Sequence, residues 1–367
     1  MRKFFIALIF CLFSFNGFSA HIVGGEIYYD CLGGNNYRLT LKIYRDCFGE
    51  GAPFDPKVIL GVFDSSGTLI HDLRVPFPGS TQIPNTINNP CNLPPNDVCV
   101  EEAVYVATVN LPPIPGGYTI AYQRCCRNNT ISNIVNPGGV GATYTCHIPD
   151  SSIALCNSSP RFKKFPPTYI CLNVPLSFDH SATDPDGDSL VYEFADPLIG
   201  GATWDPKPFP LPPPYSTVIW IPPYTTQNQI NSAPAVVLNS TSGMITGTPN
   251  RIGQWVVGVC VKEYRNKKLI SRNIRDFQFN VTPCPNIQVS AILSQTKFCF
   301  GMTVDFINTS LNSVSYFWDF GDPFSTNDTS SLFAPSYTYS QAGTYTVDLL
   351  RKSFQFKIKY SAYQLHP

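Results

Sequence analysis

The sequence has little charge and no excess of either sign. Charged residues make up 14% of its 367 residues, and 25 basic side chains balance 25 acidic ones. Nucleic acids and acidic membranes are recognised through clusters of Lys and Arg, so this composition excludes nucleic acid as an expected partner. Beyond its first residues the chain also lacks any stretch apolar enough to predict a transmembrane segment.

Motifs of common enzyme classes are missing as well. None of the five histidines lies in an HExxH zinc motif, and neither a GxSxG nucleophile elbow nor a phosphate-binding glycine loop occurs. Glu101 and Glu102 are adjacent, but a strand would point them to opposite faces, unlike a catalytic acid and base. The sequence therefore predicts a protein that is not an enzyme.

Helical periodicity is absent too. Short segments of alternating apolar and polar residues occur instead, and each is bounded by Gly, Pro, Asn or Asp. Examples are 36–46, 57–64, 101–111 and 116–125. With 34 prolines and 25 glycines, this pattern predicts an all-β protein of many short strands, and the length predicts several domains.

The first twenty residues have the pattern of a secretory signal peptide. Arg2 and Lys3 are basic, an apolar run extends from Phe4 to Phe15, and Ala20 is a small residue at the expected cleavage point. The run is too short to span a membrane. We therefore expect residues 1–20 to be removed and the mature chain to be secreted, either free outside the cell or held at its surface.

Cysteines are numerous and unevenly distributed. Twelve of the 13 follow the signal peptide, and this even number in an exported chain predicts disulfides rather than free thiols. Nine lie between Cys31 and Cys171, so we expect the N-terminal module to be the cross-linked one, although the pairing cannot be read from the sequence. The candidates are Cys31, Cys47, Cys91, Cys99, Cys125, Cys126, Cys146, Cys156, Cys171, Cys260, Cys284 and Cys299.

Cys125 and Cys126 are adjacent and raise a separate question. A disulfide between neighbours departs from ordinary disulfide geometry, and alternation along a strand would send the two side chains to opposite faces. We therefore predict that each pairs with a different cysteine. The alternative is a zinc site completed by Cys146 and His147.

Two motifs in the second third of the chain resemble the cadherin-like, immunoglobulin-type repeats of bacterial surface proteins. The first is DPDGDSLVY, from Asp184 to Tyr192, and the second is GMITGTP, from Gly243 to Pro249. The resemblance implies a β-sandwich over 161–284 whose acidic turn contributes to calcium binding. The carboxylates of Asp184, Asp186 and Asp188 are hard oxygen ligands, so calcium is the expected cofactor; simple solvation of the turn is the alternative.

A third pattern resembles the polycystic-kidney-disease (PKD) repeat, a small β-sandwich. It consists of a WDFGD segment followed by YTYSQAGTYTV, although Pro323 replaces the usual glycine. We expect a PKD-like sandwich over 285–350 in which the aromatic residues of the motif pack in the core and its aspartate caps a turn. The structural motif residues are Trp318, Asp319, Phe320, Gly321, Asp322 and Tyr345.

Aromatic and proline residues gather in the insertion at 201–232. Trp204 and Trp220 lie outside clean alternation there, so they could form a platform that stacks on sugar rings. Packing of the insertion against its own module is the alternative.

The order of these modules is similar to that of the PKD-domain and gliding-motility-associated surface proteins of Bacteroidetes. The sequence is thus divided into a signal peptide at 1–20, modules at 21–160, 161–284 and 285–350, and an atypical tail at 351–367 that is either a truncated end or a short tail. The resemblance implies a C-terminal sorting domain, and none is visible in this sequence. It implies tandem Ig-like sandwiches that act in adhesion, surface motility or spacing, with an extracellular protein or polysaccharide surface as partner. A carbohydrate-binding accessory protein is the second hypothesis, and an enzyme in the N-terminal module is the third.

Overall fold

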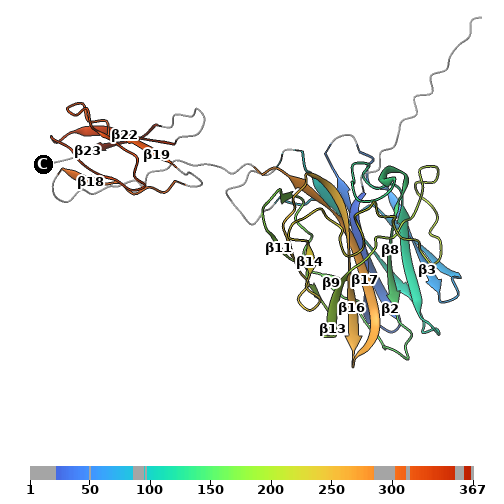
Figure 1. Ribbon diagram of the computed structural model, residues 1–367. Coiled ribbons are helices and arrows are strands. Elements are labelled where there is room, and N and C mark those ends of the chain that lie inside the picture. Colours follow the sequence, from blue (N-terminus) through green and yellow to red (C-terminus); the bar gives the residue numbers. More distant parts are fainter. Residues whose placement is uncertain are drawn as a thin grey trace, which may run out of the picture. The chain divides into compact units, whose positions relative to one another are not determined.

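The computed structural model describes residues 22–48, 51–85, 95, 97–284, 302–310, 315–351 and 359–364 (Figure 1). These residues are almost entirely strands and loops, with one short 3-10 helix at Pro137–Gly139. The predicted all-β class is therefore confirmed. The predicted signal peptide lies outside the described residues. The described part of the chain divides into two compact units, with the boundary between Pro283 and Cys284.

One long sheet runs through the first unit. Its strand order is β13-β16-β17-β1-β2-β6-β5, and β10 pairs in parallel with β17. Both halves of the unit thus contribute strands to a single sheet. The strands are β1 (Ile22–Gly33), β2 (Asn36–Asp46), β5 (Thr81–Gln82), β6 (Val100–Asn110), β10 (Ile170–Cys171), β13 (Ser189–Phe194), β16 (Gly253–Arg265) and β17 (Lys268–Thr282).

A four-stranded sheet of order β4-β3-β7-β8 encloses the first core together with β1, β2 and β6. Its strands are β3 (Lys57–Asp64), β4 (Leu69–Pro76), β7 (Tyr118–Arg124) and β8 (Ala142–Ile148). Alternation in β1 directs Ile27 and Tyr29 into this core, where both are fully buried. The alternating segments recognised in the sequence thus form the expected strands.

A second core lies on the opposite face of the long sheet. Gly25 is the register partner of Asp276, so Phe277 and Phe279 of β17 point away from the face that carries Ile27. They pack with Trp255 of β16 and with short strands that cover this face. These strands are β9 (Arg161–Phe162), β11 (Leu176–Asp179), β12 (Ala182–Thr183), β14 (Val237–Leu238) and β15 (Met244–Gly247).

The strands β1 and β17 join the two halves closely. A Cβ atom on Gly24 would lie 2.2 Å from the carbonyl oxygen of Asp276, so this crossing requires a residue without a side chain. Glu26 forms a buried ion pair with Arg275 on one face of the sheet, and Arg127 forms another with Asp276 on the other face, at 2.5 Å. The predicted boundary at residue 160 is therefore not a boundary between compact units: 21–160 and 161–284 share one sheet.

Disulfides cross-link the N-terminal half, as predicted. Cys31 pairs with Cys156 and Cys47 with Cys99, while Cys171 and Cys284 are also disulfide-bonded. Cys146 and Cys260 are buried free thiols, so their assignment as disulfide candidates was wrong. Burial raises the pKa of the Cys260 thiol to about 12. Cys91 and Cys299 lie outside the described residues.

The prediction for the adjacent pair was also wrong. Cys125 and Cys126 are bonded to each other, and the peptide bond between them is cis. Strand β7 ends at Arg124, so the alternation on which the prediction rested does not extend to the two cysteines. Both side chains are buried beneath the insertion, where a Cβ atom on Gly201 would lie 2.7 Å from the backbone nitrogen of Cys125.

The second unit contains two small sheets around an aromatic core. One sheet pairs β18 with β21, and the other has four strands in the order β20-β19-β22-β23. The predicted atypical tail supplies β23, which pairs antiparallel with β22. The strands are β18 (Thr303–Asp305), β19 (Tyr316–Asp319), β20 (Thr329–Ser330), β21 (Ser336–Thr338), β22 (Thr344–Arg351) and β23 (Lys359–Gln364).

Candidate calcium site

The acidic turn connects β12 to β13 in the first unit. The carboxylate of Asp184 accepts hydrogen bonds from the backbone N–H groups of Asp186 and Asp188, at 2.9 and 3.0 Å. Gly187 has a φ of 82°, a conformation that residues with side chains rarely adopt. The sequence folds locally into a tight turn because the first aspartate caps it and the glycine permits the reversal.

Strand β16 brings a fourth carboxylate to this turn. Asp184, Asp186, Asp188 and Glu263 each place a carboxylate oxygen within 4.8 Å of the others. Glu263 is fully buried, and its Oε2 accepts hydrogen bonds from Ser271 at 2.5 Å and from Asn157 at 3.1 Å. Among the described residues, neither Oε1 of Glu263 nor Oδ2 of Asp184 has a hydrogen-bond partner.

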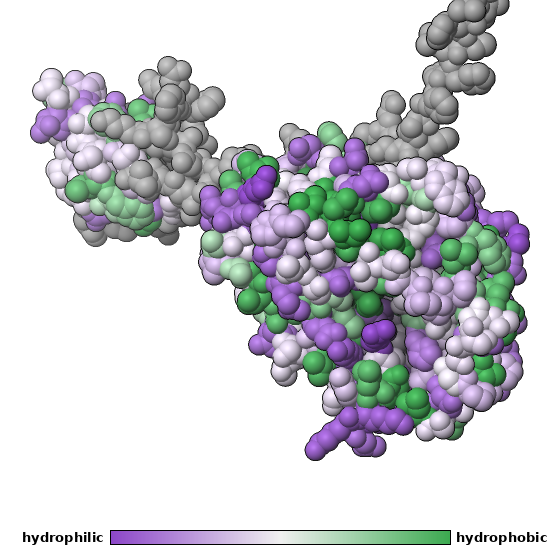
Figure 2. All heavy atoms as spheres, turned by 45° about the vertical axis from the view of Figure 1, so that its right-hand side comes forward, coloured by the Kyte–Doolittle hydropathy of each residue, from purple (hydrophilic) through white to green (hydrophobic). Residues whose placement is uncertain are grey.

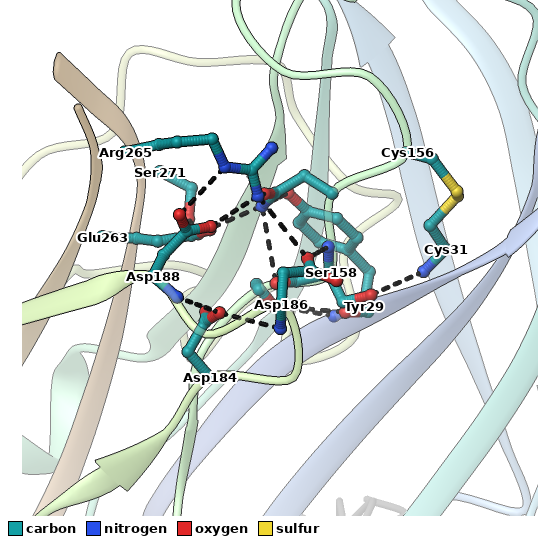
Figure 3. A network of polar contacts seen from close by, with 12 residues as sticks. Tyr29, Cys31, Cys156, Ser158, Asp184, Asp186, Asp188, Glu263, Arg265 and Ser271 are labelled. Carbon is teal, nitrogen blue, oxygen red and sulfur yellow. Dashed lines mark hydrogen bonds and ion pairs between the residues drawn. A yellow bond between two sulfur atoms is a disulfide. The ribbon is translucent and has the colours of Figure 1, made fainter.

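Arg265 and the segment at 157–158 hold the cluster from the other side (Figure 3). The guanidinium of Arg265 bonds both oxygens of Asp188, at 2.9 and 2.5 Å, and also donates to the side-chain oxygen of Asn157. The backbone N–H of Ser158 donates to Asp186 at 2.6 Å. Cys156 precedes this segment and forms a disulfide with Cys31 of β1. The cluster therefore connects the disulfide-linked N-terminal half of the unit to the acidic turn.

The charges of the cluster are unbalanced. Burial and the neighbouring Asp188 and Asp184 raise the pKa of Glu263 to about 8, whereas hydrogen bonds from Asn157 and Ser271 act in the opposite direction. Burial also raises the pKa of Asp184, while the hydrogen bonds from Arg265 lower that of Asp188. One guanidinium therefore faces four carboxyl groups, and a proton or a cation bound here would reduce the negative charge that remains.

The four carboxylates of the cluster fit a divalent cation that prefers oxygen ligands. Four carboxylates at this spacing can supply several of the six to eight oxygen ligands that calcium takes. The two unpartnered oxygens of Asp184 and Glu263 are the ones best placed to bind it, together with Asp186. Asp188 would share its oxygens with Arg265, so it contributes mainly negative charge.

Sequence reasoning found the three aspartates but missed Glu263 and the residues around it. A signal was present: Trp255, Val257, Val259 and Val261 alternate onto the core face of β16, and Glu263 is the next position in that series. A carboxylate at a core position of a strand indicates a buried partner or a ligand. Asn157, Ser158 and Arg265 carried no comparable signal because their contacts cross more than 25 residues of sequence.

The structure separates the two tryptophans of the predicted sugar platform. Trp204 is 86% exposed, as a platform requires. Trp220 is half-buried against the second core, and its indole N–H donates to Asp196 at 2.8 Å. Trp220 therefore anchors the insertion and is not free to stack on a sugar; in this respect the packing alternative describes the insertion better.

The motif residues of the second unit occupy the places expected for a structural role. Trp318 and Phe320 are buried in the core, and the carboxylate of Asp319 accepts a hydrogen bond from the N–H of Gly321 at 3.0 Å. Asp322 is buried and accepts from Phe324 N–H and from the hydroxyl of Tyr337. Tyr345 packs in the core, and its hydroxyl donates to the carbonyl of Gln341 at 2.8 Å.

Comparison with known proteins supports this part of the analysis. Residues 280–353 match the PKD domain family. The chain is therefore a modular protein with a PKD domain, and this domain together with the disulfides fits an extracellular protein. No curated protein matches the chain.

Among solved structures, the chain aligns with the N-terminal four Ig domains of Dscam1 isoform 4.4. The identity is 11%, and the alignment covers 93% of this chain and 73% of that one. The TM-score of 0.17 is too low to support any inference from it. Within the described ranges, no helix has the length and hydropathy needed to cross a membrane.

Proposed function

We propose that the protein is a non-catalytic surface protein that acts in adhesion or surface motility, and that calcium bound at the acidic turn stiffens its first unit. The observation that carries this proposal is the cluster of Asp184, Asp186, Asp188 and Glu263, in which two buried carboxylate oxygens have no partner among the described residues. Calcium would offset most of the excess negative charge and hold the turn against β16.

The position of the cluster gives the cation a mechanical role. The acidic turn contacts Ser158 directly, and Asn157 bonds both Glu263 and Arg265. Because Cys156 is tied to β1, a cation here would couple the turn, β16 and the N-terminal strands into one element. A stiffened unit in series with a PKD domain suits a chain that spaces or presents a binding surface.

The mixed hydropathy of the face shown in Figure 2 is consistent with a protein that presents a binding surface. Hydrophilic and hydrophobic side chains are interspersed over this face of the first unit, without a broad field of strongly hydrophilic residues. With a formal net charge of zero, the protein lacks the electrostatic attraction that would draw it to a highly charged polymer. The expected partner is a protein or polysaccharide surface recognised through local contacts.

Isothermal titration of the full chain with calcium tests this proposal. Extracellular calcium modules bind with dissociation constants of about 0.1 to 1 mM, and we expect a value in this range with a stoichiometry of one. Asp184→Asn should weaken binding at least tenfold, because it removes one of the two free buried oxygens. Asp72→Asn is the matched control, since Asp72 lies on β4 and, within the described ranges, forms an ion pair only with the exposed Arg74. Unchanged binding in Asp184→Asn would refute the assignment.

A carbohydrate-binding accessory role is the second candidate, and the exposure of Trp204 favours it. An exposed indole can stack on a sugar ring. Binding to a glycan array that is lost in Trp204→Ala but kept in Trp220→Phe would support this role. Equal binding by Trp204→Ala and the parent chain would exclude this platform.

A further inference from the structure

A groove of about 680 Å³ lies in the first unit, apart from the acidic cluster. It is bounded by β8, by one face of the long sheet at β16 and β17, and by the insertion around Tyr215. Three consecutive residues of β8 line it, namely Thr145, Cys146 and His147. A strand that lines a groove with consecutive residues presents its backbone there as well as its side chains.

Strand β8 is an edge strand, because the order of its sheet is β4-β3-β7-β8. The N–H of Thr143 donates to the carbonyl of Leu198 at 3.2 Å, so the main-chain groups of Thr143 point away from β7. In an antiparallel ladder this orientation repeats every second residue. The N–H and C=O groups of Thr145 and His147 therefore also point away from β7, and no main-chain partner occurs for them among the described residues.

The insertion covers only the first part of this edge. Leu198 and Ile199 bond to Thr143, the latter through the Thr143 hydroxyl at 2.7 Å, and the edge is open beyond that point. Unpaired main-chain groups on an edge strand are a template for another strand. The position next to Thr145 and His147 continues the line of main-chain pairing that Leu198 begins.

The groove offers a floor and a charge in addition to this edge. Cys260 and Ile274 are register partners on β16 and β17 and line its apolar floor. Its two carboxylates are already engaged: Glu193 pairs with Lys262 at 2.7 Å, and Asp196 accepts from Trp220 and Thr226. Arg272 is exposed and has no ion pair among the described residues, so an incoming group with negative charge would be favoured.

From these contacts we infer that the groove binds an extended, acidic peptide segment of a protein partner, which adds a strand to β8. Its main chain pairs with Thr145 and His147, one row of its side chains faces Cys260 and Ile274, and a carboxylate meets Arg272. Strand addition of this kind obtains affinity from main-chain hydrogen bonds and specificity from pockets for alternate side chains. The inference does not depend on calcium binding at the acidic turn.

A displayed library of random peptides, selected on the full chain, tests this site. We expect enriched sequences to alternate β-branched residues with polar ones and to carry Asp or Glu. Thr145→Pro removes the N–H that points into the groove but no main-chain hydrogen bond to β7, so the strand should still form. It also removes the hydroxyl that donates to the carbonyl of Ile120 at 2.8 Å, and Thr145→Val removes the same hydroxyl. Thr145→Pro should weaken the enriched peptides at least tenfold, whereas Thr145→Val, which keeps the N–H, should change binding less than threefold.

Two further measurements separate strand pairing from other modes of binding. Arg272→Ala should weaken acidic peptides about tenfold, and Arg74→Ala, at the exposed edge strand β4, should have no effect. Hydrogen exchange should show slower exchange at Thr145 and His147 when a selected peptide is added. The inference fails if no peptide is enriched, if Thr145→Pro binds as well as the parent chain, or if a glycan occupies the groove and Thr145→Pro leaves its binding intact.

Discussion

Replacing Glu263 with Gln keeps the shape of the buried side chain but removes its ability to ionise. Gln can still accept the hydrogen bonds from Asn157 and Ser271, and its amide can donate toward Asp188. The substitution therefore imitates the protonated carboxyl group and isolates the effect of its charge on the free energy of unfolding.

The pKa of Glu263 sets the expected magnitude. Burial raises it from 4.5 to about 8 in the folded protein, so the folded chain holds a proton that the unfolded chain releases. The free energy of unfolding therefore falls as the pH rises through this range, and the loss is complete above about pH 8. Between about pH 4.5 and pH 7 the loss amounts to about 3 kcal/mol, at about 1.4 kcal/mol per pH unit.

Calcium should narrow the difference in stability between the two proteins. Without calcium, Glu263→Gln should be more stable than the parent chain at pH 8 by up to a few kcal/mol. At a calcium concentration about 100 times the dissociation constant, the parent chain gains about 2.7 kcal/mol and the variant much less. For a unit of this size the gain corresponds to a rise in Tm of about 5 to 10 °C.

Urea denaturation followed by tryptophan fluorescence measures these differences, since Trp255 is buried in the second core of the first unit. Glu102→Gln on β6 is the control, because Glu102 is half-buried and pairs with Lys42. At each pH, the free energy of unfolding of the variant is subtracted from that of the parent chain. This difference removes the contribution of other titrating groups. Parallel pH profiles for the parent chain and Glu263→Gln, with or without calcium, would refute the assignment of the raised pKa.

Three other predictions concern the first unit. Glu26→Gln should lower the free energy of unfolding by about 3 to 5 kcal/mol, because it leaves the fully buried Arg275 without its ion partner; urea denaturation should show this, and a loss below 1 kcal/mol would contradict it. Replacing Cys31 and Cys156 together with Ser opens a loop of 125 residues and should cost about 2 to 5 kcal/mol, measured in the same way, whereas an unchanged midpoint would exclude a stabilising role for this disulfide. Burial and the neighbouring Arg275 hold the pKa of His180 well below 6.5, so the parent chain should lose stability as the pH falls below about 6.5; His180→Gln should lose less between pH 8 and pH 5, and an equal loss would show that His180 does not cause it.

Local patterns predicted the strands and turns of this protein well. The alternating segments at 36–46 and 101–111 form β2 and β6, and the aromatic residues of the WDFGD segment pack in the core of the second unit. Each of these features depends on the side-chain period of a strand or on the turn chemistry of Asp and Gly. The side-chain period and the turn chemistry can both be recognised within about ten residues of sequence.

Features that depend on distant contacts could not be predicted in this way. The pair of Glu26 and Arg275 joins residues separated by 249 positions, and no local pattern indicates that β1 belongs beside β17. For this reason 21–160 was separated from 161–284. The glycines at 24 and 25 were a sign of close backbone approach, but the sequence does not say which strand approaches.

The candidate site likewise contains a local part that the sequence indicates and a distant part that it does not. The turn from Asp184 to Asp188 was recognisable because its residues are consecutive, whereas Glu263 joins it from β16 through tertiary packing. The pairing of Cys125 with Cys126 was missed for a different reason. The prediction assumes strand alternation through Cys125 and Cys126, but β7 ends at Arg124.

A crystal structure of the chain grown with calcium tests the central claim most directly. We expect one calcium ion with ligand distances of about 2.3 to 2.6 Å to the Oδ2 of Asp184 and the Oε1 of Glu263. Anomalous scattering would identify the ion, and Arg265 should keep its bonds to Asp188. A cluster without an ion at millimolar calcium, in which Glu263 instead shares a proton with Asp188, would contradict the account.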